Sequence, residues 1–116
     1  MRIATFNLEN LDLPPKAQIP IETRAEILRP ALKRLQADVL CLQEINGQHI
    51  KGKKERVLAA FDTLIKGTCY QEYHRATTTS HSGHGVADVH NLVTLSKYPL
   101  LSQREVRHQL VPPIQY

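Results

Sequence analysis

The sequence predicts a single α/β (α+β) domain in which a mixed sheet is flanked by two helices. Two observations lead to this fold class. A strand-like segment, an amphipathic helical segment and a second strand-like segment follow one another within residues 3–42, and a second amphipathic segment and a further apolar, β-branched run follow later. The 116 residues suffice for one small domain, residues 1–116, and are too few for two.

The first strand is expected at residues 3–8, a compact run of apolar and β-branched side chains. Side chains alternate along a strand, so Asn7 and Glu9 should point to the same side of the sheet. Residues 11–20 hold three prolines and are expected to form a loop.

A helix should begin near Thr23, because Thr23 and Glu26 have the spacing of a capping box. Pro30 interrupts the helical pattern and should kink the helix or mark a restart. The apolar stripe of this helix is expected to consist of Ile27, Leu28, Ala31, Leu32 and Leu35.

The second strand is a buried apolar run, residues 39–42, that stops at Gln43 and Glu44. A strand, helix and strand in this order form neighbouring parallel strands, whose carboxyl ends lie at one edge of the sheet. Asn7 and Glu9 should therefore come close to Glu44. Two carboxylates and an amide oxygen suit Mg²⁺ or Mn²⁺ better than Zn²⁺. The alternative interpretation is that Glu44 is a solvated turn residue.

The remaining elements are predicted in order. A polar loop at residues 46–54 should lead to a second helix at residues 54–66, followed by strands at 70–76, 92–95 and 101–110. The buried stripe of the second helix is expected to be Val57, Leu58, Phe61, Leu64 and Ile65, and Gly67 should end it.

The longest predicted loop, residues 77–91, carries His81, His84 and His90. A zinc site is one interpretation, but no cysteine accompanies them and their spacing matches no standard site. A solvated loop or a phosphate-contacting loop is the favoured one. The two cysteines, Cys41 and Cys69, are too scattered for a disulfide framework, which predicts a reducing, cytoplasmic location.

The net charge of +4 is compatible with a polyanionic partner, although ordinary surface charge is the favoured explanation. A basic stretch between the two predicted helices and the histidine loop together could contact nucleic acid, and a solvated charged face is the favoured alternative. The basic residues concerned are Lys51, Lys53, Lys54 and Arg56. No run approaches the ~20 apolar residues that span a bilayer.

Three segments, residues 2–10, 37–45 and 91–100, together resemble the endonuclease/exonuclease/phosphatase superfamily, which includes deoxyribonuclease I. The middle segment is the most specific, because its strand ends in Leu-Gln-Glu as in the family. The resemblance implies that Asn7 and Glu44 are the catalytic residues that hold a divalent cation. Glu9 would be a further metal ligand. It also implies hydrolysis of phosphate esters, with a phosphodiester such as DNA or RNA as the substrate.

Two departures from the family pattern limit what these 116 residues should do. Asn91 stands where the family often has glycine, and the Asp-x-Asn and Ser-Asp-His motifs of the family's second half are missing. We therefore expect the amino-terminal half of a four-layer α/β/β/α sandwich, inactive or nearly so in isolation. The alternative is a non-catalytic assembly or nucleic-acid-binding module that forms a homodimer, or pairs with a partner supplying the second half, through an exposed sheet face.

Overall fold

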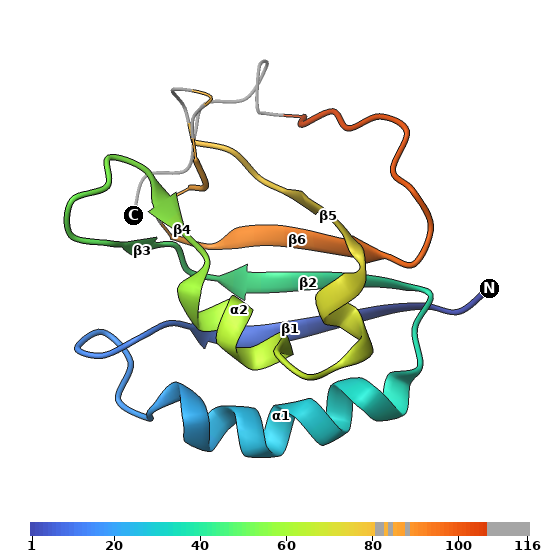
Figure 1. The fold of residues 1–116 in the computed structure, drawn as a ribbon, viewed down its shortest axis with the longest axis horizontal. Helices are drawn as coiled ribbons and strands as arrows, with labels where there is room; N and C mark the ends of the chain where they lie inside the picture. Colours follow the sequence, from blue (N-terminus) through green and yellow to red (C-terminus); the bar gives the residue numbers. More distant parts are fainter. Residues whose placement is uncertain (81–82, 84, 88, 107–116) are drawn as a thin grey trace.

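Four strands form one mixed sheet in the order β1-β2-β6-β5 (Figure 1). The strands are β1 (Ile3–Leu11), β2 (Val39–Ile45), β6 (Asn91–Ser96) and β5 (His74–Thr77). β1 and β2 are parallel, whereas β6 is antiparallel to both β2 and β5. The computed structural model describes residues 1–80, 83, 85–87 and 89–106. It confirms the mixed sheet and the parallel pair that the strand-helix-strand pattern predicts.

Two helices, α1 (Ile21–Leu35) and α2 (Ala59–Ile65), cover the same face of the sheet (Figure 1). They are joined by Arg29, whose guanidinium donates to the carbonyl oxygens of Leu64 at 2.9 Å and Thr63 at 2.6 Å. None of the helices that the structure describes has the length and apolar character needed to cross a bilayer.

The core lies between these helices and the sheet. It includes Leu40 and Leu42 from β2 and Phe61 from α2, all 1% exposed or less. On the opposite face of the sheet Ile3 is 65% exposed and Leu92 56% exposed. One mixed sheet with two helices on one face is the arrangement expected for half of the α/β/β/α sandwich.

The helix α1 differs from the prediction at its start and along its stripe. It begins at Ile21 after Pro20 and has no side-chain cap, so the proposed Thr23 and Glu26 capping box is wrong. Thr23 already lies inside the first turn, where its hydroxyl cannot act as an N-cap. Ile27 is 72% exposed, which removes it from the predicted stripe. The residues that pack on the core are Ile21, Ala25, Leu28, Leu32 and Leu35.

The helix runs without a break through Pro30, which is exposed, so no restart occurs there. The second helix is shorter than predicted, because residues 54–58 do not join it. A small hairpin precedes it, in which β3 (Gln48–His49) pairs with β4 (Arg56–Val57). The strand propensity of Val57 is used in this hairpin, and the rest of the predicted stripe is buried in the core.

The predicted strand at residues 70–76 divides into a 3₁₀ turn, η1 (Cys69–Glu72), and the short strand β5. Tyr70 explains the change. Its ring is fully buried, and its hydroxyl group donates a hydrogen bond to the Leu32 carbonyl oxygen of α1 at 2.8 Å. The predicted strand at 101–110 is not formed over residues 101–106, and its remainder lies outside the described residues.

Candidate metal centre

The predicted site residues lie at the carboxyl ends of β1 and β2. Asn7 of β1 is paired with Gln43 of the parallel strand β2, so Glu44 follows directly on the neighbouring strand. Asn7 and Glu9 are exposed, and Glu44 is partly exposed, so all three are within reach of solvent. The prediction that these segments share one edge of the sheet is confirmed.

Both strands leave regular geometry at this edge. Between Asn7 and Leu11 the strand β1 advances four residues while β2 advances two. Between Leu42 and Ile45 the strand β2 advances three residues while β6 advances two. Such bulges redirect side chains and are common beside active sites. They also interrupt the alternation on which the predicted common orientation of Asn7 and Glu9 depends.

Left-handed backbone conformations are concentrated at the same edge. Glu9, Asn10 and Glu44 have φ values of 48°, 51° and 58°, and His90, at the start of the neighbouring strand β6, has 57°. None of these residues is glycine, so each conformation has an energetic cost that the surrounding contacts must offset. Strain of this kind at one place is typical of functional sites.

Backbone amides of this turn orient the two principal candidate ligands. The Glu9 amide donates to Asn7 Oδ1 at 2.8 Å, and the Asn10 amide donates to Glu44 Oε2 at 3.2 Å. The left-handed turn is therefore the element that links the amide oxygen of one strand to the carboxylate of the next.

Arg24 of α1 holds this turn from the helix side. Its guanidinium donates to the Leu8 carbonyl oxygen at 2.6 Å and to the Glu9 carbonyl oxygen at 3.2 Å. A planar guanidinium can bond two neighbouring carbonyl oxygens at once, which an ammonium group does less well. Arg24 therefore ties the first helix to the strained end of β1.

His90 holds the turn from the opposite side. Its Nε2 lies within hydrogen-bond distance of Asn10 Oδ1, at 2.6 Å. The His90 amide donates to Asn46 Oδ1 at 3.3 Å, and Asn46 Nδ2 donates to Asp12 Oδ2 at 2.9 Å. The start of β6 is thus connected to the ends of both parallel strands.

Asp12 is the buried anchor of this network, only 6% exposed. Burial by itself raises the pKa of its carboxyl group. Hydrogen bonds from Asn46, Gln48 and the Leu13 amide, together with the charge of Lys16, outweigh this effect and lower the pKa below its usual value. Asp12 is therefore ionised at neutral pH, which keeps its oxygens available as acceptors.

The exposed oxygens at this edge fit a hard divalent cation. Carboxylate and amide oxygens are the protein ligands that Mg²⁺ accepts, and Mg²⁺ commonly keeps several waters beside one or two carboxylates. Within the described part of the chain no three His, Cys, Asp or Glu side chains gather as a metal-binding group. His81 and His84 of the predicted histidine loop lie outside the described residues.

Asn91, which departs from the family pattern, is completely buried. Its Oδ1 accepts from the Thr78 hydroxyl and the Ala87 amide, both at 2.8 Å, and its Nδ2 donates to the Ile45 carbonyl oxygen at 3.1 Å. The side chain thus joins the end of β2 to the chain that precedes β6, a role that a glycine could not fill.

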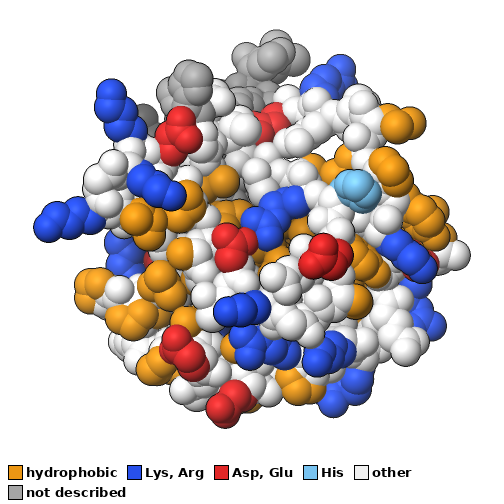
Figure 2. Space-filling model, viewed as in Figure 1, with side chains coloured by type: hydrophobic (Ala, Val, Ile, Leu, Met, Phe, Trp, Pro, Cys, Tyr) orange, Lys and Arg blue, Asp and Glu red, His pale blue; other side chains and the backbone are white. Residues whose placement is uncertain are grey.

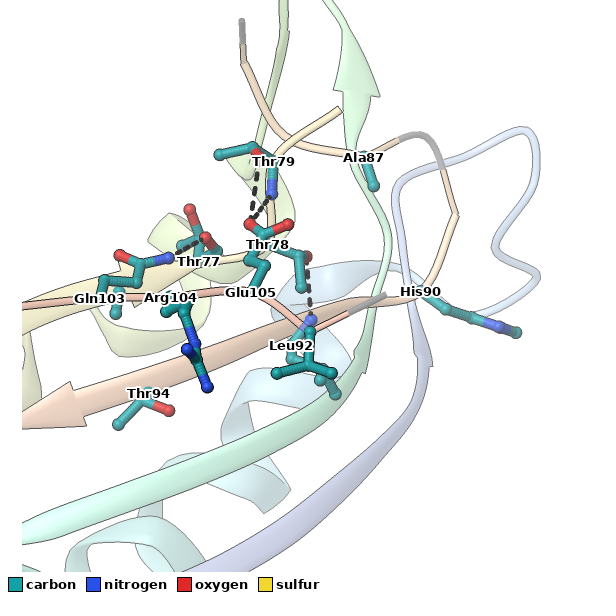
Figure 3. A pocket seen from close by; sticks show the side chains of 12 residues that line it. Thr77, Thr78, Thr79, Ala87, His90, Leu92, Thr94, Gln103, Arg104 and Glu105 are labelled. Atoms are coloured by element: carbon teal, nitrogen blue, oxygen red, sulfur yellow. Dashed lines mark hydrogen bonds between the residues drawn. The ribbon is translucent and has the colours of Figure 1, made fainter. Parts of the chain in front are cut away.

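A hollow of about 440 Å³ lies nearby, on the face of β5 and β6 that the helices leave uncovered (Figure 3). Gln103 Nε2 donates to the Thr77 carbonyl oxygen at 2.8 Å, and the Thr79 amide donates to Glu105 Oε1 at 2.6 Å. Figure 3 shows the ring of His90 pointing away from these threonines. His90 is nevertheless one of the residues that line the hollow, so the hollow reaches the start of β6 beside the turn.

Comparison with known proteins decides the family. The model of the Endonuclease/Exonuclease/phosphatase family matches residues 4–113. The chain belongs to this family. Its members are nuclease- and phosphatase-type hydrolases that generally depend on a divalent metal. No curated protein and no solved structure matches the chain.

Several residues of this edge were not anticipated from the sequence. They are Asn10, Asp12, Arg24 and Asn46, with His90 assigned only to a loop. The residue type of Asn10 could have indicated a turn with a left-handed backbone, because asparagine tolerates that conformation better than most residues. Arg24 gave no such indication beyond its position on a polar helix face, because its two carbonyl partners are defined by the tertiary structure.

Proposed function

We propose that these residues form the metal-binding part of a Mg²⁺-dependent phosphoesterase that hydrolyses phosphodiester bonds in the manner of a nuclease. The observation that carries the proposal is a pair of hydrogen bonds at the sheet edge. Asn7 Oδ1 accepts from the Glu9 amide, and Glu44 Oε2 accepts from the Asn10 amide of the same turn. Glu44 and Asn7 would hold the cation, Mg²⁺ or Mn²⁺, and Glu9 would add a further carboxylate.

The donor set supports this assignment. A bound cation would stabilise negative charge on the phosphate during hydrolysis. Glu44 supplies the negative charge that attracts the cation, and Asn7 supplies a neutral oxygen whose direction is fixed by the Glu9 amide. No Lys or Arg within the described residues forms an ion pair with Glu44. The Glu44 carboxylate is therefore available to a bound cation.

A titration with Mg²⁺ tests the metal site. We expect calorimetry to detect one site and Glu44→Gln to weaken binding by at least about 100-fold, because glutamine keeps an acceptor for the Asn10 amide but loses the charge. Glu22→Gln, in the exposed first turn of α1, is the matched control and should change little. Equal affinities for both variants and the native chain would refute the site.

We also propose that these 116 residues alone turn over little substrate. The sequence contains neither Asp-x-Asn nor Ser-Asp-His, and His90 is hydrogen-bonded to Asn10. Plasmid DNA and bis(p-nitrophenyl) phosphate with Mg²⁺ are suitable substrates. Robust hydrolysis that disappears in Glu44→Ala would contradict this claim while supporting the metal site.

A second candidate function is assembly through the uncovered sheet face, with a second copy of the chain as the partner. The supporting observation is exposed apolar surface on that face: Ile3 is 65% exposed and Leu92 56%. Sedimentation should then show a dimer that Leu92→Lys dissociates. A monomer at all concentrations would argue against this candidate.

Two narrower expectations remain predictions. The basic residues Lys51, Lys53 and Lys54 are exposed and lie between β3 and β4, where DNA binding would show as steep salt dependence. Cys41 and Cys69 are both free thiols, as a reducing, cytoplasmic location would require.

A further inference from the structure

A hollow of about 370 Å³ opens directly beside the candidate metal centre. Glu9 and Asn10 form the wall nearest the site, residues 16–19 of the β1–α1 loop form another, and Arg24 of α1 lines it as well. The hollow therefore begins at the turn that orients the candidate metal ligands and extends away from it.

The hollow contains two cationic side chains. Lys16 is exposed, and no ion pair to it occurs among the described residues. Arg24 has five N–H donors and uses two groups, Nη1 and Nη2, for the carbonyl oxygens of Leu8 and Glu9, so donors remain for a ligand. An ammonium beside a guanidinium is a typical setting for a phosphate group.

The positive charge extends beyond this hollow. Lys16 also lines an adjoining hollow of about 330 Å³, together with Arg56 of the β3–β4 hairpin and the buried Asp12. Figure 2 shows several Lys and Arg side chains on the side of the molecule where this hairpin lies in Figure 1. An anionic substrate would therefore meet positive charge as it leaves the candidate metal centre on this side.

We propose that the hollow lined by Lys16 and Arg24 binds a second phosphate group of the substrate, while the phosphate to be cleaved lies at the metal centre. The proposal rests on the proposed function, because it assumes a phosphoester at the Glu44 and Asn7 edge. The substrate would then be a compound with two phosphates, such as neighbouring nucleotides or a phosphorylated inositol headgroup.

Glu9 makes the two sites interdependent. Glu9 lines the hollow, and its negative charge opposes an anion there until a cation at the neighbouring centre offsets it. The second phosphate should therefore bind more tightly in Mg²⁺ than in its absence. This coupling distinguishes a subsite of the metal centre from unspecific attraction to surface lysines, which would not depend on Mg²⁺ in this direction.

Binding of matched ligands to the full 116-residue chain tests the proposal. One pair is the dinucleotide TpT and its 5′-phosphorylated form pTpT, and the other is glycerophosphoinositol and its 4-phosphate. In Mg²⁺ we expect the added phosphate of at least one pair to increase affinity by about tenfold, the effect of one charge-assisted contact. The pair that responds identifies the source of the second phosphate.

Two lysine variants provide the control. Lys16→Ala should reduce the gain from the added phosphate to about twofold or less, whereas Lys33→Ala, an exposed lysine in the last turn of α1, should preserve it. A gain that is absent in both pairs, or equal in Lys16→Ala and the native chain, would overturn the subsite. Equal losses in both lysine variants would also overturn it.

The same samples separate this proposal from the proposed function. If Mg²⁺ binds through Glu44 but the added phosphate gives no gain, the metal site stands and the subsite fails. If the gain depends on Lys16 but not on Mg²⁺ or Glu44, the hollow binds phosphate and the phosphoesterase assignment fails.

Discussion

The two ends of the parallel pair β1–β2 are built in different ways. At the amino end the register is unbroken from Ile3 opposite Val39 to Asn7 opposite Gln43, and the Arg2 amide donates to Asp38 Oδ2 at 2.6 Å. At the carboxyl end both strands bulge, and Glu9 and Asn10 of β1 and Glu44 of β2 adopt left-handed backbone conformations.

This contrast separates stability from function. The regular part of the sheet supplies its own hydrogen bonds and buries leucines against two helices, which is the main source of folding free energy. The irregular edge needs side chains such as Arg24, Asp12 and His90 to support its backbone. Substitutions in the first region should change stability, and substitutions in the second should change ligand binding.

The largest effect is expected in the regular region. Phe61 is completely buried in α2 and lies beneath the guanidinium of Arg75, 5.0 Å from its ring centroid. Phe61→Ala should lower the free energy of unfolding by about 3–5 kcal/mol in urea titrations. The Mg²⁺ affinity of the molecules that remain folded should be unchanged. A variant with normal stability and lost metal binding would abolish the contrast between the two regions.

Asn7→Ala should have the opposite profile. It removes a candidate ligand and the acceptor of the Glu9 amide, so calorimetry should report at least about tenfold weaker Mg²⁺ binding. The loss of one exposed hydrogen bond should cost only about 1 kcal/mol of unfolding free energy. Thr5→Ala, two residues earlier on the same strand, is the control and should leave the metal affinity unaltered.

Arg24→Lys tests whether the Arg24 guanidinium orients the turn at the end of β1. Lysine keeps the charge but cannot bond both the Leu8 and Glu9 carbonyl oxygens in the same way, so the turn should lose its orientation. We expect a decrease of about tenfold in Mg²⁺ affinity, as for other side chains that orient metal ligands. Arg34→Lys, exposed at the other end of α1, should behave like the native chain. Identical affinities for the two lysine variants would mean that Arg24 does not position the site.

The smallest effect concerns pH. The pKa of Asp12 is lowered in the folded chain from a usual value of 3.8, so its ionised form stabilises the fold above that value. This contribution should be lost as the pH falls below about 4 and the carboxyl group takes up a proton. Asp12→Asn should flatten this part of the stability profile in thermal unfolding. If Asp12→Asn left the loss of thermal stability at acid pH unchanged, Asp12 would not anchor the edge.

The sequence predicted the regular region well for a simple physical reason. Apolar runs such as residues 39–42 and the stripe on α2 have periods that depend on local geometry alone. The parallel pairing then follows from the helix between the strands, and so does the shared edge of Asn7 and Glu44.

The irregular edge was only partly predictable. Which residues lie there follows from topology, but their exact backbone does not, because Glu9 and Glu44 adopt left-handed conformations that their residue types disfavour. The turn at Glu9 and Asn10 is held by hydrogen bonds of Arg24 and His90, which are distant in sequence. The start of α1 was misplaced for a related reason, since Pro20 precedes a helix whose first residue, Ile21, is held by core packing and not by a cap.

Paramagnetic broadening by Mn²⁺ in amide NMR spectra locates the bound cation without reference to activity. At substoichiometric Mn²⁺ we expect the amides of residues 7–10 and 43–46 to broaden first, while those of α2 remain sharp. Broadening that begins elsewhere, for example around His49 or His74, or that spreads evenly over the chain, would contradict a metal centre at the ends of β1 and β2.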